Sequence, residues 1–234
     1  MNPDRRPTDR RRLLVAVVLG LVVVATTGWL WHEDRETVAT TDTVEVGDSP
    51  DGSADQPSCG PVRREAVDGA GDHVDEGSIT YSSAPPSFGD HRSRWAVGAP
   101  SFYDVDDRPE VAVLVHNLEH GYNILWYDQA VVDDPDALAH VQDIAGDYAT
   151  LGGPPDPDTA FIAAPWTDED GAPFPDGAHF ALTHWYADPS DRSASRADEV
   201  GLTRFCSTIS ASIVQEWMDA YPLSDAPEGY PDLM

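Results

Sequence analysis

The order of apolar and polar positions divides the chain into four stretches. An Arg-rich segment, residues 1–12, precedes nineteen residues without a charge, residues 13–31, which are enough to cross a bilayer as a helix. Residues 32–58 are polar, acidic and poor in bulky side chains, so we expect a disordered acidic stalk. Short apolar runs alternate with turn residues from 59 to 234, which predicts one folded domain there.

Short apolar runs within the folded region predict β-strands. Val111–Val115 and Tyr122–Tyr127 are rich in β-branched and aromatic residues, and they flank six polar-centred residues that end in Gly121. We therefore expect a central β-hairpin spanning residues 111–128. Further strands are expected at 78–81, 159–164 and 179–186.

Two segments have the features of helices. Asp134 and Pro135 begin the first, as capping preferences favour, and we expect it to run to about Tyr148. The second is an amphipathic stretch from Gly201 to Tyr221. Together these elements predict an α+β domain, with a mainly antiparallel sheet, a central β-hairpin and two packing helices, preceded by one transmembrane helix.

The amino terminus predicts export of the domain. The Arg cluster before the uncharged span should stay in the cytoplasm, which places residues 59–234 on the extracytoplasmic side of the cell membrane, anchored by a single pass. Trp29 and Trp31 lie where an interfacial aromatic belt belongs. A cleaved signal peptide is the alternative, and it would export the domain as well.

Charge excludes one class of partner. The formal net charge is −28, and all fourteen basic residues are Arg. Such a surface repels nucleic acid, so we expect no nucleic-acid partner. A salt-adapted source would explain the acidity without any functional role.

The two cysteines also fit an exported domain. Cys59 precedes the predicted elements and Cys206 lies near their end. In an oxidising compartment we expect a disulfide between them, and two unpaired thiols are the alternative.

Three side chains that can bind a metal or transfer a proton lie within five residues, in His116-Asn117-Leu118-Glu119-His120. If the hairpin forms, His116 and His120 face each other across the strand ends, at a spacing that suits joint metal ligation. The same residues have the order H-x-x-E-H of the inverzincin zinc-protease motif, but that motif requires a helix. The strand-like flanks therefore argue against the protease. In the alternative interpretation both histidines only bond to backbone.

A wider set of side chains extends this candidate site. His91 ends a Pro/Gly-rich loop close to the hairpin in sequence, and such loops often bring a ligand to a rigid scaffold. We expect a metal site built from His91, His116 and His120, with Glu119 or His73 as a further ligand. Three imidazoles suit zinc or copper. His184 is the strand residue that we expect to share the sheet face of the site.

The motifs resemble those of a known bacterial family. Tyr81, Pro85-Pro86-Ser87, Trp95 and especially Val115-His116-Asn117-Leu118-Glu119-His120-Gly121 are similar to the pattern of the domain of unknown function 3105 family, over roughly residues 59–228. Phe102 stretches the spacing between Gly98 and Tyr103 relative to that pattern. The resemblance implies an exported, membrane-anchored protein, and it implies no particular activity.

Three classes of function remain open. The first is a membrane-anchored module that binds zinc or copper and serves metal handling or the assembly of a membrane enzyme, with a protein partner in the membrane. The second is a metal-dependent hydrolase with Glu119 as general base. The third is a structural or partner-binding ectodomain without a metal. The sequence has no nucleophile elbow, phosphate-binding loop or dinucleotide fingerprint, which favours a protein that is not an enzyme.

Overall fold

The computed structural model describes residues 58–67, 71–149, 158–191 and 196–229. No helix in those ranges is long and apolar enough to cross a membrane. The span expected at 13–31, the Arg-rich tail before it and nearly all of the expected stalk lie outside the described residues. The elements, in chain order, are β1 Arg63–Ala66, α2 Val111–Glu119, β2 Asn123–Tyr127, α3 Gln129–Val132, α4 Pro135–Gly146, β3 Phe161–Pro165, β4 Phe180–Tyr186, η1 Arg196–Asp198, β5 Val200–Cys206, α5 Ala211–Ala220 and η2 Leu223–Asp225.

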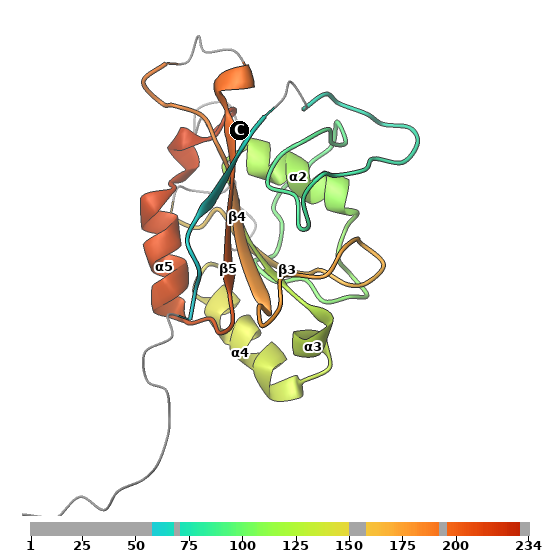
Figure 1. Ribbon diagram of the computed structural model, residues 1–234, viewed down its shortest axis with the longest axis vertical. Helices are drawn as coiled ribbons and strands as arrows, with labels where there is room; N and C mark the ends of the chain where they lie inside the picture. Colours follow the sequence, from blue (N-terminus) through green and yellow to red (C-terminus); the bar gives the residue numbers. More distant parts are fainter. Residues whose placement is uncertain (1–57, 68–70, 150–157, 192–195, 230–234) are drawn as a thin grey trace, which may run out of the picture. The chain divides into compact units, whose positions relative to one another are not determined.

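The described strands form one five-stranded mixed sheet in the order β1-β5-β4-β2-β3 (Figure 1). Three of its four pairings are antiparallel, and β2 pairs with β3 in parallel. A parallel pair requires a crossover connection, which here contains α3 and α4. The expected α+β class is therefore confirmed, and the mixed sheet is mainly antiparallel with one parallel pair.

The expected central hairpin is wrong. Its second strand is β2, but the first apolar run forms helix α2, and every residue of α2 after Val111 is buried. A short apolar run that is buried on all sides has no amphipathic period, so the pattern cannot separate a buried strand from a buried helix. Packing then overrides the β-propensity of the valines.

Two other expectations also fail in part. Residues 201–206 belong to strand β5, and helix α5 begins only after Ser210, whose hydroxyl accepts the Ile213 N–H. Residues 78–81 form no strand, whereas β1 was not expected. The expected helix from Asp134 and the strands near 159–164 and 179–186 are confirmed as α4, β3 and β4.

Each face of the sheet is covered by different helices. Leu182 on β4 packs in one apolar cluster with residues of α4 and α5. Trp185, three positions later on the opposite face, packs in a second cluster with Leu114, Val115 and Leu118 of α2. Alternation along the strand thus anchors α2 on its own side of the sheet.

The two cysteines lie at the edge of the first cluster. The sulfurs of Cys59 and Cys206 are 2.04 Å apart, which is disulfide distance, as the sequence predicts. The pair joins the start of the described domain to the end of β5. The disulfide therefore closes a loop of the chain that spans 147 positions, from Cys59 to Cys206.

Candidate metal centre

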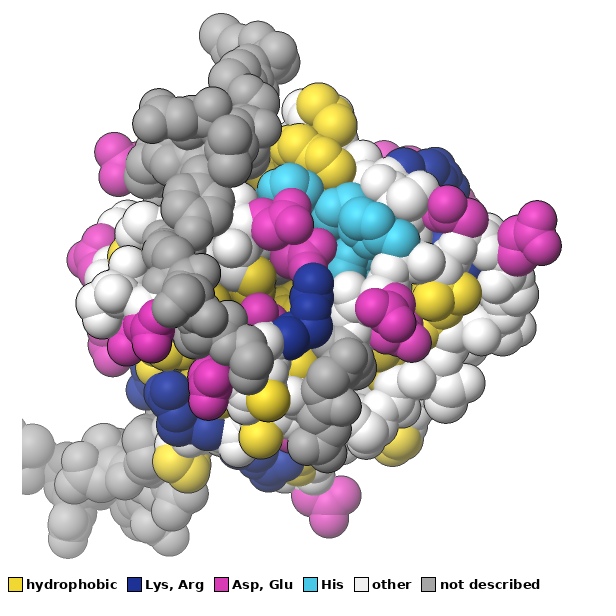
Figure 2. All heavy atoms as spheres, turned by 90° about the horizontal axis from the view of Figure 1, so that it is seen from above, with side chains coloured by type: hydrophobic (Ala, Val, Ile, Leu, Met, Phe, Trp, Pro, Cys, Tyr) yellow, Lys and Arg dark blue, Asp and Glu magenta, His cyan; other side chains and the backbone are white. Residues whose placement is uncertain are grey.

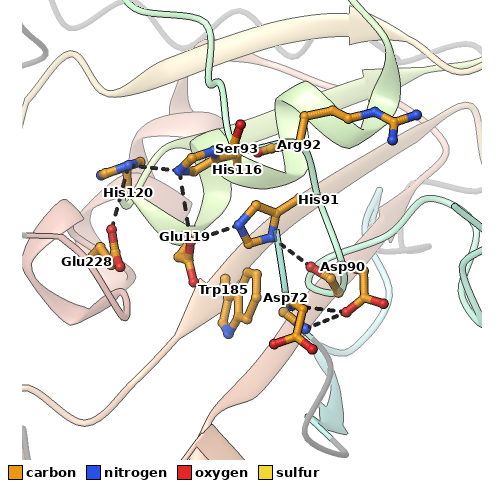
Figure 3. Close-up of polar contacts among 12 residues, drawn as sticks. Asp72, Asp90, His91, Arg92, Ser93, His116, Glu119, His120, Trp185 and Glu228 are labelled. Atoms are coloured by element: carbon orange, nitrogen blue, oxygen red, sulfur yellow. Dashed lines mark hydrogen bonds and ion pairs between the residues drawn. The ribbon is translucent and has the colours of Figure 1, made fainter. Parts of the chain in front are cut away.

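Two loop segments and the end of helix α2 meet at one place (Figure 3). His116 and Glu119 come from the last turn of α2, while His73 and His91 pair with each other as a short parallel bridge. One ligand atom from each of these four residues lies within 4.8 Å of the ligand atoms of the other three. The structure thus brings together four of the five residues that the sequence singled out as ligands.

Backbone carbonyls orient two of the imidazoles. His91 Nδ1 lies 2.8 Å from Gly89 O, and His116 Nδ1 lies 2.7 Å from Arg92 O. A carbonyl oxygen only accepts, so each Nδ1 must carry the proton and donate. When these imidazoles are neutral, each Nε2 is therefore unprotonated and carries a lone pair. Ligating histidines are commonly held in this way by their second nitrogen.

Glu119 is the negative charge at the centre of the cluster. Its Oε2 lies 2.9 Å from His91 Nε2 and 4.0 Å from His116 Nε2, while its Oε1 accepts a hydrogen bond of 2.8 Å from Arg196. Burial raises the pKa of Glu119, but the contacts with His91 and Arg196 outweigh it and lower the pKa to about 2. The carboxylate is therefore ionised throughout the neutral range.

The two oriented histidines differ in their protonation. Burial, and then the neighbouring His91, lower the pKa of His116 to about 4, so its imidazole is neutral at pH 7. Burial also acts to lower the pKa of His91, but the adjacent Glu119 carboxylate outweighs burial and raises it. His91 Nε2 lies 2.9 Å from Glu119 Oε2, so a proton on His91 and the negative charge on Glu119 stabilise each other.

His73 forms the open side of the cluster. Its ring centroid lies 4.9 Å from that of His91 and 4.9 Å from that of His116, and it is the one exposed member of the four. Figure 2 shows histidine side chains gathered at the surface of one face, beside acidic side chains. An ion could therefore reach the cluster from solvent.

His120 lies next to the cluster rather than in it. Its Nε2 is 3.1 Å from His116 Nε2 and 3.7 Å from Glu228 Oε2, and its ring packs on Trp95 at 4.7 Å between centroids. The expectation that His116 and His120 face each other across strand ends is wrong. They lie one helical turn apart, at the end of α2 and its carboxyl cap.

The helical spacing removes the reason for setting aside the zinc-protease motif. The roles of that motif are nevertheless not reproduced. Glu119 points at His91 and is paired with Arg196, and a carboxylate with a pKa near 2 is a weak base. His120 also falls outside the group of four ligand atoms.

Three neighbours of the cluster carried no signal in the sequence. Arg196 lies 77 positions from Glu119, Glu228 contacts His120 from near the carboxyl terminus, and Trp185 packs edge-on against His91.

His184, expected on the site's face, lies instead on the opposite face, where its ring stacks on Tyr221. Strand alternation beside Trp185 explains this reversal.

Comparison with protein families assigns the chain. A family model described as a protein of unknown function, DUF3105, matches residues 73–231, which is more than half of the sequence. The chain belongs to the DUF3105 family. The matched range contains all five candidate ligands, which are His73, His91, His116, Glu119 and His120. No curated protein and no solved structure was found to match this DUF3105 chain.

Proposed function

We propose that this DUF3105 domain binds one zinc or copper(II) ion through His73, His91, His116 and Glu119. The observation that carries the proposal is the convergence of these four ligand atoms within 4.8 Å of one another. Donors that ligate one ion at about 2.0–2.1 Å must themselves lie a few ångströms apart. A small adjustment of side chains therefore suffices for binding.

The donor types narrow the choice of ion. Three imidazoles and a carboxylate suit zinc and copper(II), whereas copper(I) prefers sulfur ligands. Among the described residues no cysteine is free, because Cys59 and Cys206 are paired. Met218 is buried in the core cluster beneath α5, away from the face that carries α2.

The burial of His91 and Glu119 also supports a bound ion. His91 is 0% exposed and Glu119 is 1% exposed, and His91 Nε2 lies 2.9 Å from Glu119 Oε2. Loss of the His91 proton would leave two electron-pair donors side by side, and an ion would be ligated by both. The Arg196 contact to Oε1 would leave Oε2 of Glu119 free to bind that ion.

Binding is a better account of this geometry than hydrolysis. Glu119 is the sole carboxylate among the four converging residues and is held as an anion, so it suits a ligand more than a general base. We further propose a role in metal handling or in the assembly of a membrane enzyme. The sequence supports its presentation outside the cell membrane by an anchor at residues 13–31, with a membrane protein as partner. Protease added to intact cells would then digest residues 59–234.

Metal titration of matched variants tests the proposal. The purified chain should bind one equivalent of zinc or copper(II), measured by elemental analysis after desalting, and His91→Ala and His116→Ala should lose it. His179→Ala is the control, because His179 is half exposed and pairs with Asp128 instead. Equal metal content in all four proteins would attribute binding to the acidic surface and reject the site.

A further inference from the structure

A second polar cluster lies on the other face of the sheet, beneath the end of α5. Asn123 at the start of β2 donates from Nδ2 to Tyr221 O at 2.9 Å, and the His184 ring stacks on Tyr221 at 5.9 Å between centroids. Trp217 packs on the same tyrosine at 4.5 Å. Asp225 in η2 completes the group, with Oδ1 3.7 Å from His184 Nε2.

Several buried polar atoms of this cluster lack hydrogen-bond partners among the described residues. Asn123 Oδ1, both ring nitrogens of His184, Trp217 Nε1 and Asp225 Oδ1 have no hydrogen-bond partner within the described ranges. Asn123 and His184 are 0% exposed, Trp217 is 1% exposed and Asp225 is 7% exposed. Native proteins leave few such atoms unpaired, and buried water is their usual partner.

The donors and acceptors indicate which ligand fits. Trp217 Nε1–H can only donate, whereas Asn123 Oδ1 can only accept. A cation would be repelled by the indole N–H, and an anion would be repelled by the side-chain oxygens of Asn123 and Asp225. Water both donates and accepts, and a polar contact of 3.7 Å between His184 and Asp225 is one that water can bridge.

The cluster also adjoins the segment that reaches the candidate metal centre. Asp225 O accepts the Ala187 N–H, and Glu228 N–H donates to Glu119 O at 2.8 Å. On the same segment, Leu223 lies so close to Gly121 that a Cβ on residue 121 would be 2.5 Å from Leu223 O. Residues 222–228 therefore cross the end of the sheet, from the face of α5 to the end of α2.

We propose that ordered water bridges His184 Nε2 and Asp225 Oδ1, and that it fastens residues 222–228 to the sheet. The fastened segment holds Glu228 beside His120. The water site stands independently of the metal centre. Only its consequence for His120 rests on the proposed function.

Crystallography of the full chain at high resolution tests the occupant. We expect at least one ordered water within hydrogen-bond distance of a His184 ring nitrogen and Asp225 Oδ1. A metal ion, a side chain from residues 230–234, or a dry space closed by direct contacts would each overturn the proposal.

Hydrogen exchange tests the fastening. His184→Phe removes the ring nitrogens and keeps an aromatic ring against Tyr221, and we expect several-fold faster exchange of the Ala187 and Glu228 amide protons with metal content unchanged. The control is Trp126→Phe, which removes an indole donor to Thr183 on the opposite face. Unchanged exchange in His184→Phe, or the same increase in both variants, would contradict a local water-held contact. Loss of metal in His91→Ala is a separate result and does not bear on this site.

Discussion

His116 Nε2 and His120 Nε2 lie 3.1 Å apart at the end of helix α2. His116 donates its Nδ1 proton to Arg92 O, and its low pKa keeps it neutral, so its Nε2 must accept here and His120 must donate. That nitrogen has a single lone pair. A metal ion bound at His116 Nε2 therefore competes with this hydrogen bond, which makes His120 a competitor of the ion rather than a member of the four converging ligands.

The competition predicts that His120 can be replaced. His120→Phe removes the donor and keeps an aromatic ring against Trp95, so we expect metal affinity equal to or above that of the parent chain. Competition titration with a chromophoric chelator measures the affinity. Loss of binding in His120→Phe would show that His120 is itself a ligand.

Glu119 should contribute to stability as well as to metal affinity. Glu119→Gln keeps the shape but removes the charge that faces His91 and Arg196, so we expect metal-free unfolding to become easier by about 1–3 kcal/mol. Urea denaturation measures the change. Glu110→Gln is the matched control, because Glu110 pairs with Arg92 at the surface, where such pairs contribute about 0–1 kcal/mol. Equal losses in the two variants would contradict a special role for Glu119.

Metal affinity should rise with pH through the neutral range. The raised pKa of His91 means that the metal-free site holds a proton there, which the ion must displace. His116, with a pKa of about 4, is already neutral above about pH 5 and adds no competing proton. Calorimetry near pH 6.5 in buffers of different ionisation enthalpy should show that ion binding releases protons, and the release should become smaller as the pH rises. Affinity that stays constant from pH 5.5 to 8 would contradict this assignment.

Reduction of the Cys59–Cys206 pair should destabilise the domain. The two cysteines are 147 positions apart, and closing so long a loop is worth about 4–5 kcal/mol in the chain-entropy model. Thermal unfolding with and without reductant tests this expectation. Intact mass after alkylation, with and without reductant, supplies the control, since thiols that alkylate without reductant would show that no bond exists.

Local signals explain which elements the sequence predicts. Asp134 and Pro135 make the start of α4 predictable from the sequence, because the cap and the first turn lie within a few residues of each other. Helix α2 has no side-chain cap at Glu110 and no solvent-exposed polar face, since every residue after Val111 is buried. Its helical state is decided by packing against Trp185 and other distant residues, which a local pattern does not contain.

The candidate metal centre also combines residues that the sequence indicates with residues that only the tertiary structure identifies. His116 and Glu119 are close in sequence, and the loop ending at His91 carries Pro and Gly, so these ligands could be proposed before the fold was known. Arg196 and Glu228 are ordinary charges in sequence, and only the tertiary structure places them against Glu119 and His120. The error in the secondary structure of α2 did not remove the histidines from the site, because i,i+4 spacing also brings them together.

X-ray absorption spectroscopy of the zinc- or copper(II)-loaded chain tests the central claim most directly. We predict a first shell of nitrogen and oxygen at about 2.0–2.1 Å, with the outer-shell scattering of three imidazoles, reduced by one imidazole in His91→Ala. A first shell of oxygen alone, without imidazole scattering, would contradict a metal centre at His73, His91, His116 and Glu119.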